Sequence, residues 1–366
     1  MDKRVEKMAE VLIKYSLGIK KGDYLFIGAN SVSAPLVKEA YRQAILQGAL
    51  VETLIKLDGL SEIFYKNATD EQLNTPSKLS KFAFENMTAY LYLWGEFNTK
   101  QFSNIDSTKV TQSLRSQKEW REIYNERTKN GDMRWCGTQF PTQADAQEAN
   151  MSLSEYEDFV YKACLIDKDD PIAEWKRVSN EQQRIVEYLN TRNVIHVISK
   201  DTDITYKVSG RSWVNCDGKV NFPDGEVFTG PIEDSVNGHI RFSFPGIYLG
   251  KEIEDICLTF EKGKVVKASA KKGEELLNAL LDTDEGSRHV GECAIGTNYG
   301  IDKFTRNMLF DEKIGGTIHM AIGDGIPETG SKNKSSLHWD MLCDMRDGGE
   351  IYADGKLFYK DGKFLI

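Results

Sequence analysis

The character of the sequence changes near residue 190, and this change constrains the fold more than any other feature. Before it, apolar runs such as DYLFIG, ALVETLIKL and AYLYLWG alternate with helical segments such as APLVKEAYRQAILQG. Apolar strands separated by helices predict a parallel sheet with helical crossovers. After it, short alternating segments are separated by Asp-Gly and Asn-Gly pairs, including VNGH, ADGK and KDGK, which are typical of β-hairpins.

We therefore predict an α+β protein of two domains. Residues 1–188 form an N-terminal α/β domain with a parallel sheet and helices, and residues 189–366 form a mostly antiparallel β domain. A helix from about Pro171 to Asn190 joins the two, and Ser152 is the expected N-cap of the helix before it. The length of 366 residues is sufficient for two hydrophobic cores.

The composition excludes two classes of partner. The formal net charge is −9, so the surface repels phosphate backbones and anionic membranes, and we predict neither a nucleic-acid nor a membrane partner. The opening segment MDKRVEKMAEVLIKYSLGIKKGD carries charges throughout, which is typical of an amphipathic helix and not of a secretory signal. The six cysteines are scattered without a CxxC pair, a pattern that indicates reduced thiols and a cytoplasmic location.

Two histidines stand on strand-like segments in positions that suit a metal ligand. His338 and Asp340 form the motif HWD, and on a strand their side chains share one face while Trp339 points to the other. In GGTIHMAIG, His319 shares its face with small residues and lies opposite an apolar stripe. An imidazole and a carboxylate side by side on a rigid strand suit a divalent cation, so these residues are candidate ligands.

Two glutamates complete the candidate set. Glu292 lies in HVGECAIG, where Val290 and Ala294 are expected on the same strand face. A carboxylate on an apolar strand is costly unless it is paired or coordinated, so Glu292 requires a partner. Glu226 follows the PDG turn and is the first residue of the strand EVFTGP. Of the four segments with candidate ligands, this one gives the weakest indication of a metal site.

Each of these features also has a structural alternative. An HxD motif on a strand is often a hydrogen-bonded pair, and Glu292 has Arg288 and Lys303 as neighbours for a salt bridge. Glu226 is compatible with a solvated strand end, and His319 with a hydrogen-bonded histidine of the core. The structural interpretation is kept for the remaining histidines, His196, His239 and His289.

The charges of the candidate set suit a centre of two metal ions. Two divalent cations carry four positive charges, which three carboxylates and one hydroxide neutralise while both imidazoles stay neutral. Five side chains fill five of the eight positions that two tetrahedral ions require, or six if one carboxylate bridges, and a bridging hydroxide fills the remaining two. Metal ions in such pairs lie ~3.5–4 Å apart. The set is therefore sufficient for two ions.

Taken together, these segments resemble the thermophilic aminopeptidase family of two-metal metallopeptidases, of the aminopeptidase T type. The resemblance runs over most of the chain. In the first half it rests on RWCGTQFPTQADAQEANMSLSEYEDFVYKACLID. In the second half it rests on DGKVNFPDGEVFTGP, HVGECAIG, NMLFDEKIGGTIHMAIG and ETGSKNKSSLHWDML. Long motifs in the same order are more specific than any short pattern.

The resemblance implies a ligand set, an architecture and a set of partners. In that family the corresponding positions bind metal, and here they are Glu226, Glu292, His319, His338 and Asp340. Family members have an N-terminal α/β domain and a β-rich metal domain, and they form homodimers that partly enclose the active sites. Two divalent ions are the expected cofactors, with zinc or cobalt favoured and magnesium or manganese as the alternatives.

One position departs from the family pattern. Similar sequences usually carry a tyrosine seven residues after the strand histidine, where it is thought to polarise the scissile carbonyl, and here that position is Ile326. Isoleucine cannot donate a hydrogen bond, and the loss of one such donor costs about a hundred- to a thousandfold in rate. Tyr299 is a candidate replacement.

The resulting hypothesis is a cytoplasmic metallo-aminopeptidase that hydrolyses the first peptide bond of short peptides with a metal-activated water. Glu292 is assigned a catalytic role besides its role as a ligand, as a carboxylate near the attacking water. Three rivals remain: a two-metal hydrolase of another amide or a phosphoester, a metal-binding homologue that has weak or lost activity because of Ile326, and a purely structural β domain.

Overall fold

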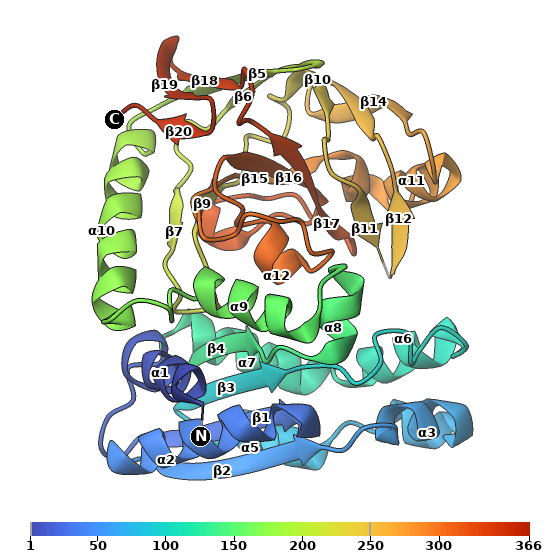
Figure 1. Ribbon diagram of the computed structural model, residues 1–366. Helices are drawn as coiled ribbons and strands as arrows, with labels where there is room; N and C mark the ends of the chain where they lie inside the picture. Colours follow the sequence, from blue (N-terminus) through green and yellow to red (C-terminus); the bar gives the residue numbers. More distant parts are fainter. Residues whose placement is uncertain (1, 249) are drawn as a thin grey trace. The chain divides into compact units, whose positions relative to one another are not determined.

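The structure of the chain is a computed structural model that describes residues 2–248 and 250–366 (Figure 1). By its internal contacts the chain divides into two compact units, of which the first contains the residues up to Ile172 together with Gly218–Phe222. The second contains Ala173–Asp217 together with Pro223–Ile366. The predicted α+β class is confirmed, because a parallel sheet lies in the first unit and antiparallel sheets lie in the second.

The joining helix belongs almost entirely to the second unit. This helix, α10, spans Pro171–Leu189, and the division between the units falls after its second residue. The domain boundaries expected from the sequence, 1–188 and 189–366, remain a prediction. None of the helices within the described ranges, 2–248 and 250–366, has the length and hydrophobicity that a membrane span requires.

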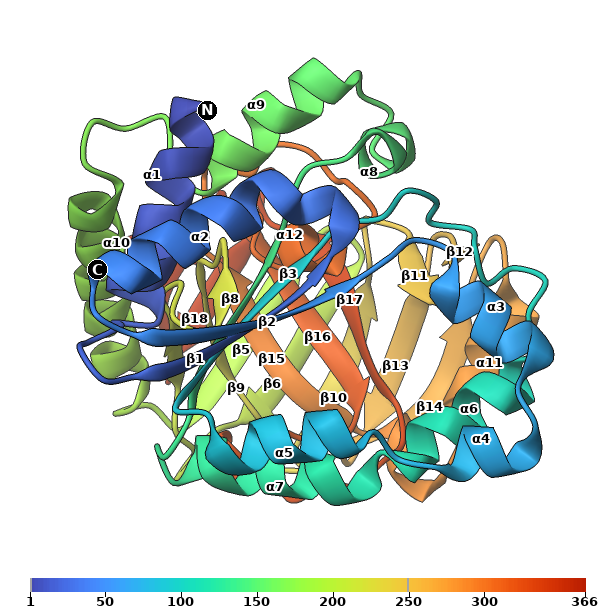
Figure 2. The same ribbon diagram turned by 90° about the horizontal axis from the view of Figure 1, so that it is seen from below.

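Sheet A is the parallel sheet of the first unit, with the order β2-β1-β3-β4-β8 among the described residues. Its strands are β1 (Tyr24–Asn30), β2 (Leu50–Lys56), β3 (Ala89–Trp94), β4 (Arg134–Gln139) and β8 (Asn221–Phe222). The helices of this unit are α1 (Lys3–Val11), α2 (Ala34–Leu46), α3 (Leu60–Asn67), α4 (Asp70–Asn74), α5 (Lys78–Asn86), α6 (Ser107–Ser116), α7 (Lys118–Lys129), α8 (Gln143–Glu148) and α9 (Leu153–Ala163). Figure 2 shows α2 on one side of sheet A and α5 and α7 on the other, as expected for helical crossovers.

Local signals explain where helices begin in this unit. Ser152 is the N-cap of α9, as predicted, and its hydroxyl accepts a hydrogen bond from the backbone N–H of Glu155. The Glu155 carboxylate accepts one from the backbone N–H of Ser152 in return, which completes a capping box.

The second unit is built mainly from antiparallel strands. Sheet B has the order β14-β13-β10-β6-β5-β18-β19-β20, sheet C has the order β17-β16-β15-β9-β7, and β11 pairs with β12, as far as the described residues show. The strands of sheet B are β5 (Val194–Ser199), β6 (Thr202–Lys207), β10 (Asn237–Arg241), β13 (Cys257–Glu261), β14 (Lys264–Ser269), β18 (Glu350–Ala353), β19 (Lys356–Lys360) and β20 (Lys363–Phe364). The other strands and helices are β7 (Val214–Cys216), β9 (Glu226–Thr229), β11 (Gly246–Tyr248), β12 (Lys251–Ile253), β15 (Val290–Gly296), β16 (Thr317–Gly323), β17 (His338–Asp344), α11 (Glu274–Leu281) and α12 (Met308–Asp311).

The Asp-Gly and Asn-Gly pairs do not all form turns. Asp354 and Gly355 have φ angles of 50° and 76° and connect β18 to β19, as predicted for a hairpin. Asn237 and Gly238 lie inside strand β10 instead. A Cβ atom on Gly238 would lie 2.1 Å from the carbonyl oxygen of Asp203, so this glycine permits close strand pairing rather than a turn.

Candidate metal centre

Four neighbouring strands of the second unit carry the predicted ligands. Glu226 is the first residue of β9, Glu292 lies on β15, His319 lies on β16, and His338 and Asp340 lie on β17. These strands are adjacent in the order β17-β16-β15-β9, and all their pairings are antiparallel. Sheet C therefore brings the predicted residues, separated by more than a hundred positions, onto adjacent strands.

Strands β16 and β17 alternate as predicted. Ile318, Met320 and Trp339 belong to the hydrophobic core of the unit, and the Trp339 indole N–H donates to the carbonyl oxygen of Ile247 at 3.0 Å. Side chains alternate along a strand, so His319 is directed to the opposite face. We call that face, which also carries His338 and Asp340 on β17, the site face of sheet C.

A β-bulge changes the expected environment of Glu292. The register of β15 against β16 shifts between Val290, which pairs with Ile322, and Glu292, which pairs with Ala321. Val290 therefore belongs to the hydrophobic core and does not share a face with Glu292, contrary to the expectation from simple alternation. Gly291 occupies the bulge, where a Cβ atom would lie 2.2 Å from the carbonyl oxygen of Asp324.

The PDG turn and a helix of the same unit fix the start of β9, where Glu226 lies. Gly225 has a φ of 126°, and a Cβ atom there would lie 2.6 Å from the Cβ of Asn298, so only glycine fits. The side-chain amide of Gln182, on α10, donates to the carbonyl oxygens of Cys216 and Glu226 at 2.9 and 3.3 Å. The ends of β7 and β9 are thereby held together.

The ligand atoms of the five residues converge. Nε2 of His319 lies 3.3 Å from Oε2 of Glu226, 3.4 Å from Oε1 of Glu292 and 4.0 Å from Oδ1 of Asp340. Nε2 of His338 lies 3.4 Å from Oε2 of Glu292 and 3.6 Å from Oδ1 of Asp340. Two overlapping groups result, one of Glu226, Glu292 and His319 and one of Glu292, His338 and Asp340, each with donor atoms within 4.8 Å of one another.

Burial and hydrogen bonding leave these atoms available to a cation. Glu226 and Glu292 are each 5% exposed and His319 is 1% exposed. Oε2 of Glu226 and Nδ1 of His319 are buried and have no hydrogen-bond partner, which is costly in a protein interior. The Nδ1–H of His338 donates to the carbonyl oxygen of Asp324 at 2.8 Å, and this bond leaves Nε2 facing the carboxylates.

The carboxylates and imidazoles strongly perturb one another. Burial acts to lower the pKa of His319, but the carboxylates of Glu292 and Glu226 outweigh it and raise the pKa to about 10. Asp340 and Glu292 likewise outweigh burial at His338 and raise its pKa to about 11. Burial raises the pKa of Glu226 to about 8, whereas hydrogen bonds from both histidines outweigh burial at Glu292 and lower its pKa to about 2. Such shifts in a compact cluster are typical of functional sites.

The residues fit a centre of divalent metal ions. Imidazole nitrogens and carboxylate oxygens are the donors that zinc and related ions prefer. Oε2 of Glu226 lies within this set 3.3 Å from Nε2 of His319 and makes no hydrogen bond, so a bound cation would give it a partner. The alternative salt bridge between Glu292 and Arg288 is not formed, because the Arg288 guanidinium pairs with Asp282 at 2.6 Å.

Sequence reasoning missed two charged residues that adjoin the centre. Glu312 has a carboxylate oxygen within 4.8 Å of ligand atoms of His319 and Asp340. Lys313, which has no exposed surface, pairs with Glu312, and its Nζ lies 3.6 Å from Oε1 of Glu226. Both residues follow the short helix α12, where neither strand alternation nor helical periodicity marks a face. Their acidic-basic pair in the segment LFDEKIGG was the available signal.

The tyrosine that the family usually carries has no replacement in Tyr299. Ile326 is half-buried, and its backbone carbonyl accepts hydrogen bonds from the N–H and the hydroxyl of Thr329. The Tyr299 hydroxyl donates to the carbonyl oxygen of Gly362 at 2.7 Å. A phenol has one proton to donate, so this bond occupies the donor that a scissile carbonyl would need.

Comparison with known proteins gives the following matches. The model of the thermophilic metalloprotease (M29) family matches residues 1–364. Aminopeptidase 2 of Geobacillus stearothermophilus is 29% identical over 367 residues, which cover 93% of this chain and 88% of the relative. The structure of wild-type AmpT from Thermus thermophilus has a TM-score of 0.87 at 24% identity, over 100% of this chain and 99% of that chain. A 2,5-dihydroxypyridine dioxygenase from Pseudomonas putida KT2440 shares the fold at a TM-score of 0.61 and 16% identity, over 99% and 96%.

A family match over nearly the whole chain defines the class of protein, which is a metal-dependent hydrolase of peptide bonds. The chain belongs to the thermophilic metalloprotease (M29) family. The resemblance and the enzyme class inferred from the sequence motifs are thereby confirmed. The dioxygenase shows that a similar fold also occurs with another chemistry, so the reaction has to be argued from the site.

Proposed function

We propose that this protein is an aminopeptidase that removes N-terminal residues from short peptides with the help of two divalent metal ions. The proposed ligands are Glu226, Glu292, His319, His338 and Asp340. Zinc or cobalt suits these nitrogen and oxygen donors, with magnesium or manganese as the alternatives. The observation that carries the proposal is the convergence of the five side chains into two groups that share Glu292.

Glu292 is central to the proposed reaction because it reaches both halves of the site. Its Oε1 faces Nε2 of His319 and its Oε2 faces Nε2 of His338, each at 3.4 Å. When bound, two divalent ions supply a Lewis acid for the scissile carbonyl, a water of lowered pKa and an anchor for the free α-amine of the peptide. We assign Glu292 a second role as the carboxylate that accepts a proton from the attacking water.

Replacement of His338 tests the ligand set. His338→Ala should abolish metal-dependent release of Leu or Ala from an aminoacyl nitroanilide, because it removes a ligand whose orientation the Asp324 carbonyl fixes. His239→Ala is the matched control, since this histidine of the same unit is exposed on β10. Full activity in His338→Ala would remove the proposal.

The position of Ile326 supports a second candidate, a homologue that keeps the metal centre but has weak or lost turnover. The usual tyrosine is absent from this position, and the Tyr299 hydroxyl is bound to Gly362. A panel of peptides, other amides and phosphoesters, assayed with Zn²⁺, Co²⁺ and Mn²⁺, separates the candidates. Tight metal binding without hydrolysis of any substrate would favour the second candidate, and hydrolysis of another amide or a phosphoester alone would favour a different two-metal hydrolase.

We also propose that the protein forms a homodimer through the edge of sheet A. Strand β2 pairs with β1 on one side, and three leucines at the end of α2, at the start of β2 and directly after β2 are 65%, 64% and 61% exposed, namely Leu46, Leu50 and Leu57. An exposed apolar edge is the kind of surface that a second copy covers. In analytical ultracentrifugation, Leu50→Lys should sediment as a monomer and not as a dimer. The control variant Leu79→Lys, on α5, should remain a dimer. A monomeric wild-type protein would contradict the proposal.

A cytoplasmic location completes the proposed function. Cys216, Cys257, Cys293 and Cys343, all of which are described residues, are free thiols. Free thiols are typical of proteins in a reducing compartment. Fractionation of cells that produce the protein tests the location, and recovery outside the cytoplasm would contradict it.

A further inference from the structure

Lys313 is a completely buried lysine at the edge of the metal centre. Burial of an ammonium is costly unless carboxylates surround it. Lys313 pairs with Glu312, its Nζ lies 3.6 Å from Oε1 of Glu226, and it interacts electrostatically with Asp224. The chain thus places a cation of its own among carboxylates that adjoin the proposed ligands.

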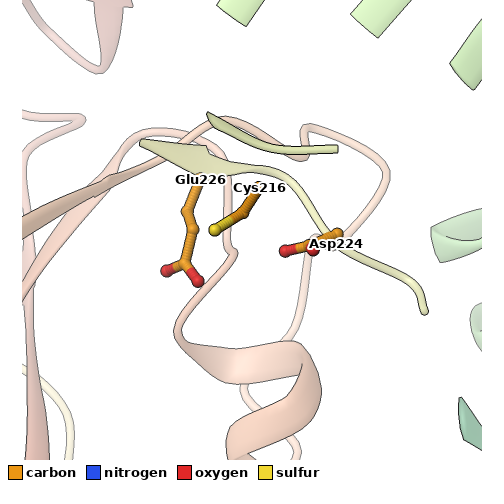
Figure 3. Close-up of side chains that lie close together, drawn as sticks. All are labelled: Cys216, Asp224 and Glu226. Carbon is orange, nitrogen blue, oxygen red and sulfur yellow. The ribbon is translucent and has the colours of Figure 1, made fainter. Parts of the chain in front are cut away.

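The cluster of Cys216, Asp224 and Glu226 lies on this side of the centre. Figure 3 shows the three side chains close together, from β7, from the loop before β9 and from β9. Their donor atoms lie within 4.8 Å of one another. Lys313 interacts electrostatically with all three residues, so this cluster forms part of the surroundings of the ammonium.

The two oxygens of Glu226 have different partners. Oε1 faces the ammonium of Lys313 at 3.6 Å, whereas Oε2 lies 3.3 Å from Nε2 of His319 and has no hydrogen-bond partner. A carboxylate with two free oxygens can rotate and bind a cation through either or both. An ion pair at Oε1 leaves Oε2 as the oxygen that is available beside His319.

We propose that Lys313 is a positioning residue of the metal centre. Its ammonium holds Oε1 of Glu226, so that Glu226 binds the metal position beside His319 through Oε2 alone. This inference rests on the proposed function, because it takes Glu226 and His319 as ligands. The position beside His338 and Asp340 does not involve Glu226, and Lys313 reaches it only through its pair with Glu312, whose carboxylate also lies near Asp340.

A positioning role and a role in charge balance predict effects of opposite sign. Removal of the ammonium leaves more uncompensated negative charge, and by Coulomb attraction alone a divalent ion would then bind more tightly. If Lys313 positions Glu226, its removal allows the carboxylate to leave the geometry that the ion requires. Loss of a group that orients a ligand weakens metal binding by about ten- to a hundredfold.

Metal titration of the full-length protein distinguishes the two roles. The protein is stripped with a chelator and titrated with Zn²⁺ or Co²⁺ in competition with a chromophoric chelator. In Lys313→Met, one of the two positions should bind about ten- to a hundredfold more weakly while the other changes less, and the visible absorption of the Co²⁺-loaded protein should change. Lys313→Arg, which keeps a cation, should recover part of the affinity.

Arg211→Met is a matched control. The Arg211 side chain is also buried and pairs with a carboxylate of the same unit, Glu233, at 2.6 Å. This variant should leave both metal affinities unchanged. If Lys313→Met folds poorly by circular dichroism, the charge-balanced variant Lys313→Met/Asp224→Asn carries the same expectation.

Two results would overturn the inference in distinguishable ways. Unchanged or tighter binding at both positions after removal of the ammonium contradicts the positioning role alone. A wild-type protein that binds no divalent ion contradicts the proposed function, and with it this inference.

Discussion

Sheets A and C contain the same number of strands among the described residues, five each, but their side chains have opposite chemistry. In parallel sheet A, one face of β3 carries Tyr90, Tyr92 and Trp94, with neighbouring rings 6.2 and 5.5 Å apart. Phe84, on α5, packs against Tyr90 and against Trp120, on α7. In antiparallel sheet C, the site face carries three carboxylates and two imidazoles.

The register of sheet C shows how these charges are accommodated. Ala321 lies between Glu292 and Asp340 on the neighbouring strands, and Ala294 lies opposite His319. The same holds for the remaining ligands, since Gly296 lies opposite Glu226 and Gly323 lies opposite His338. Each ionisable side chain thus has an alanine or glycine across from it on one neighbouring strand, although His319 also lies opposite Leu342 and Glu226 opposite Cys216.

The comparison teaches that one face is filled with packed rings, whereas the other gathers the ionisable side chains of the proposed metal centre. Aromatic rings stabilise sheet A through the area they bury and their edge and stacking contacts. Buried charges add little to the stability of sheet C and are costly when unpaired. Replacements in sheet A should therefore change stability, and replacements in sheet C should change metal binding and activity.

Glu292→Gln should have the largest effect on activity. The variant keeps the size of the side chain but removes the charge that faces both histidines. Activity should fall by about a thousandfold, because both proposed metal positions lose the charged ligand that they share. Loss of a residue that only hydrogen-bonds to a metal ligand costs roughly 10–100-fold, and loss of a ligand should cost more. Steady-state kinetics and the metal content of the purified variant measure these losses. Full metal content with normal kcat would contradict the role assigned to sheet C.

Phe84→Ala should show the reverse pattern. Phe84 is 5% exposed and contacts three aromatic rings, so its truncation should lower the free energy of unfolding by about 3–5 kcal/mol. Urea unfolding followed by tryptophan fluorescence measures the loss. Metal affinity and kcat of the folded variant should match the wild type, and a loss of metal binding would mean that the two sheets are not separate in function.

Ile326→Tyr sharpens the account of the site face. If the missing phenol limits the reaction, restoring it should raise kcat by about a hundredfold, with a smaller change in KM, because the donor acts on charge that develops in the transition state. Ile326→Phe is the control, since it adds the ring without the hydroxyl. Equal rates for the two variants would assign the effect to packing.

Metal binding should release protons, which is the smallest of the expected effects. The pKa values of His319 and His338 are raised to about 10 and 11 by the carboxylates around them, so both imidazoles carry a proton at neutral pH. A metal ion binds neutral imidazole, so affinity should rise with pH, about tenfold per pH unit for each proton released. Calorimetric titration in buffers of different ionisation enthalpy counts these protons; a pH-independent affinity would contradict the raised pKa values.

Strand alternation explains what could be predicted from the sequence. His319, His338 and Asp340 lie on regular strands, so a period of two placed them on one face and Trp339 on the other. The parallel sheet of the first unit followed from its apolar runs, and the N-cap Ser152 from its place before a helix with acidic residues in its first turns.

The remaining features depend on tertiary contacts that no periodicity reveals. The bulge at Gly291 places Val290 in the core, at a point where the carbonyl oxygen of Asp324 leaves no room for a Cβ atom. Buried Lys313 pairs with Glu226, from a distant segment, as well as with its neighbour Glu312. The two-residue strand β8 (Asn221–Phe222) joins sheet A from a distant part of the sequence and is too short to carry a strand signal.

The most direct test of the central claim is anomalous X-ray diffraction from crystals of the protein loaded with zinc, measured on both sides of the zinc absorption edge. The account predicts two anomalous peaks ~3.5–4 Å apart. One should lie beside Glu226 and His319, the other beside His338 and Asp340, with Glu292 in contact with both. A single peak, peaks elsewhere, or none in a protein that hydrolyses peptides would contradict it.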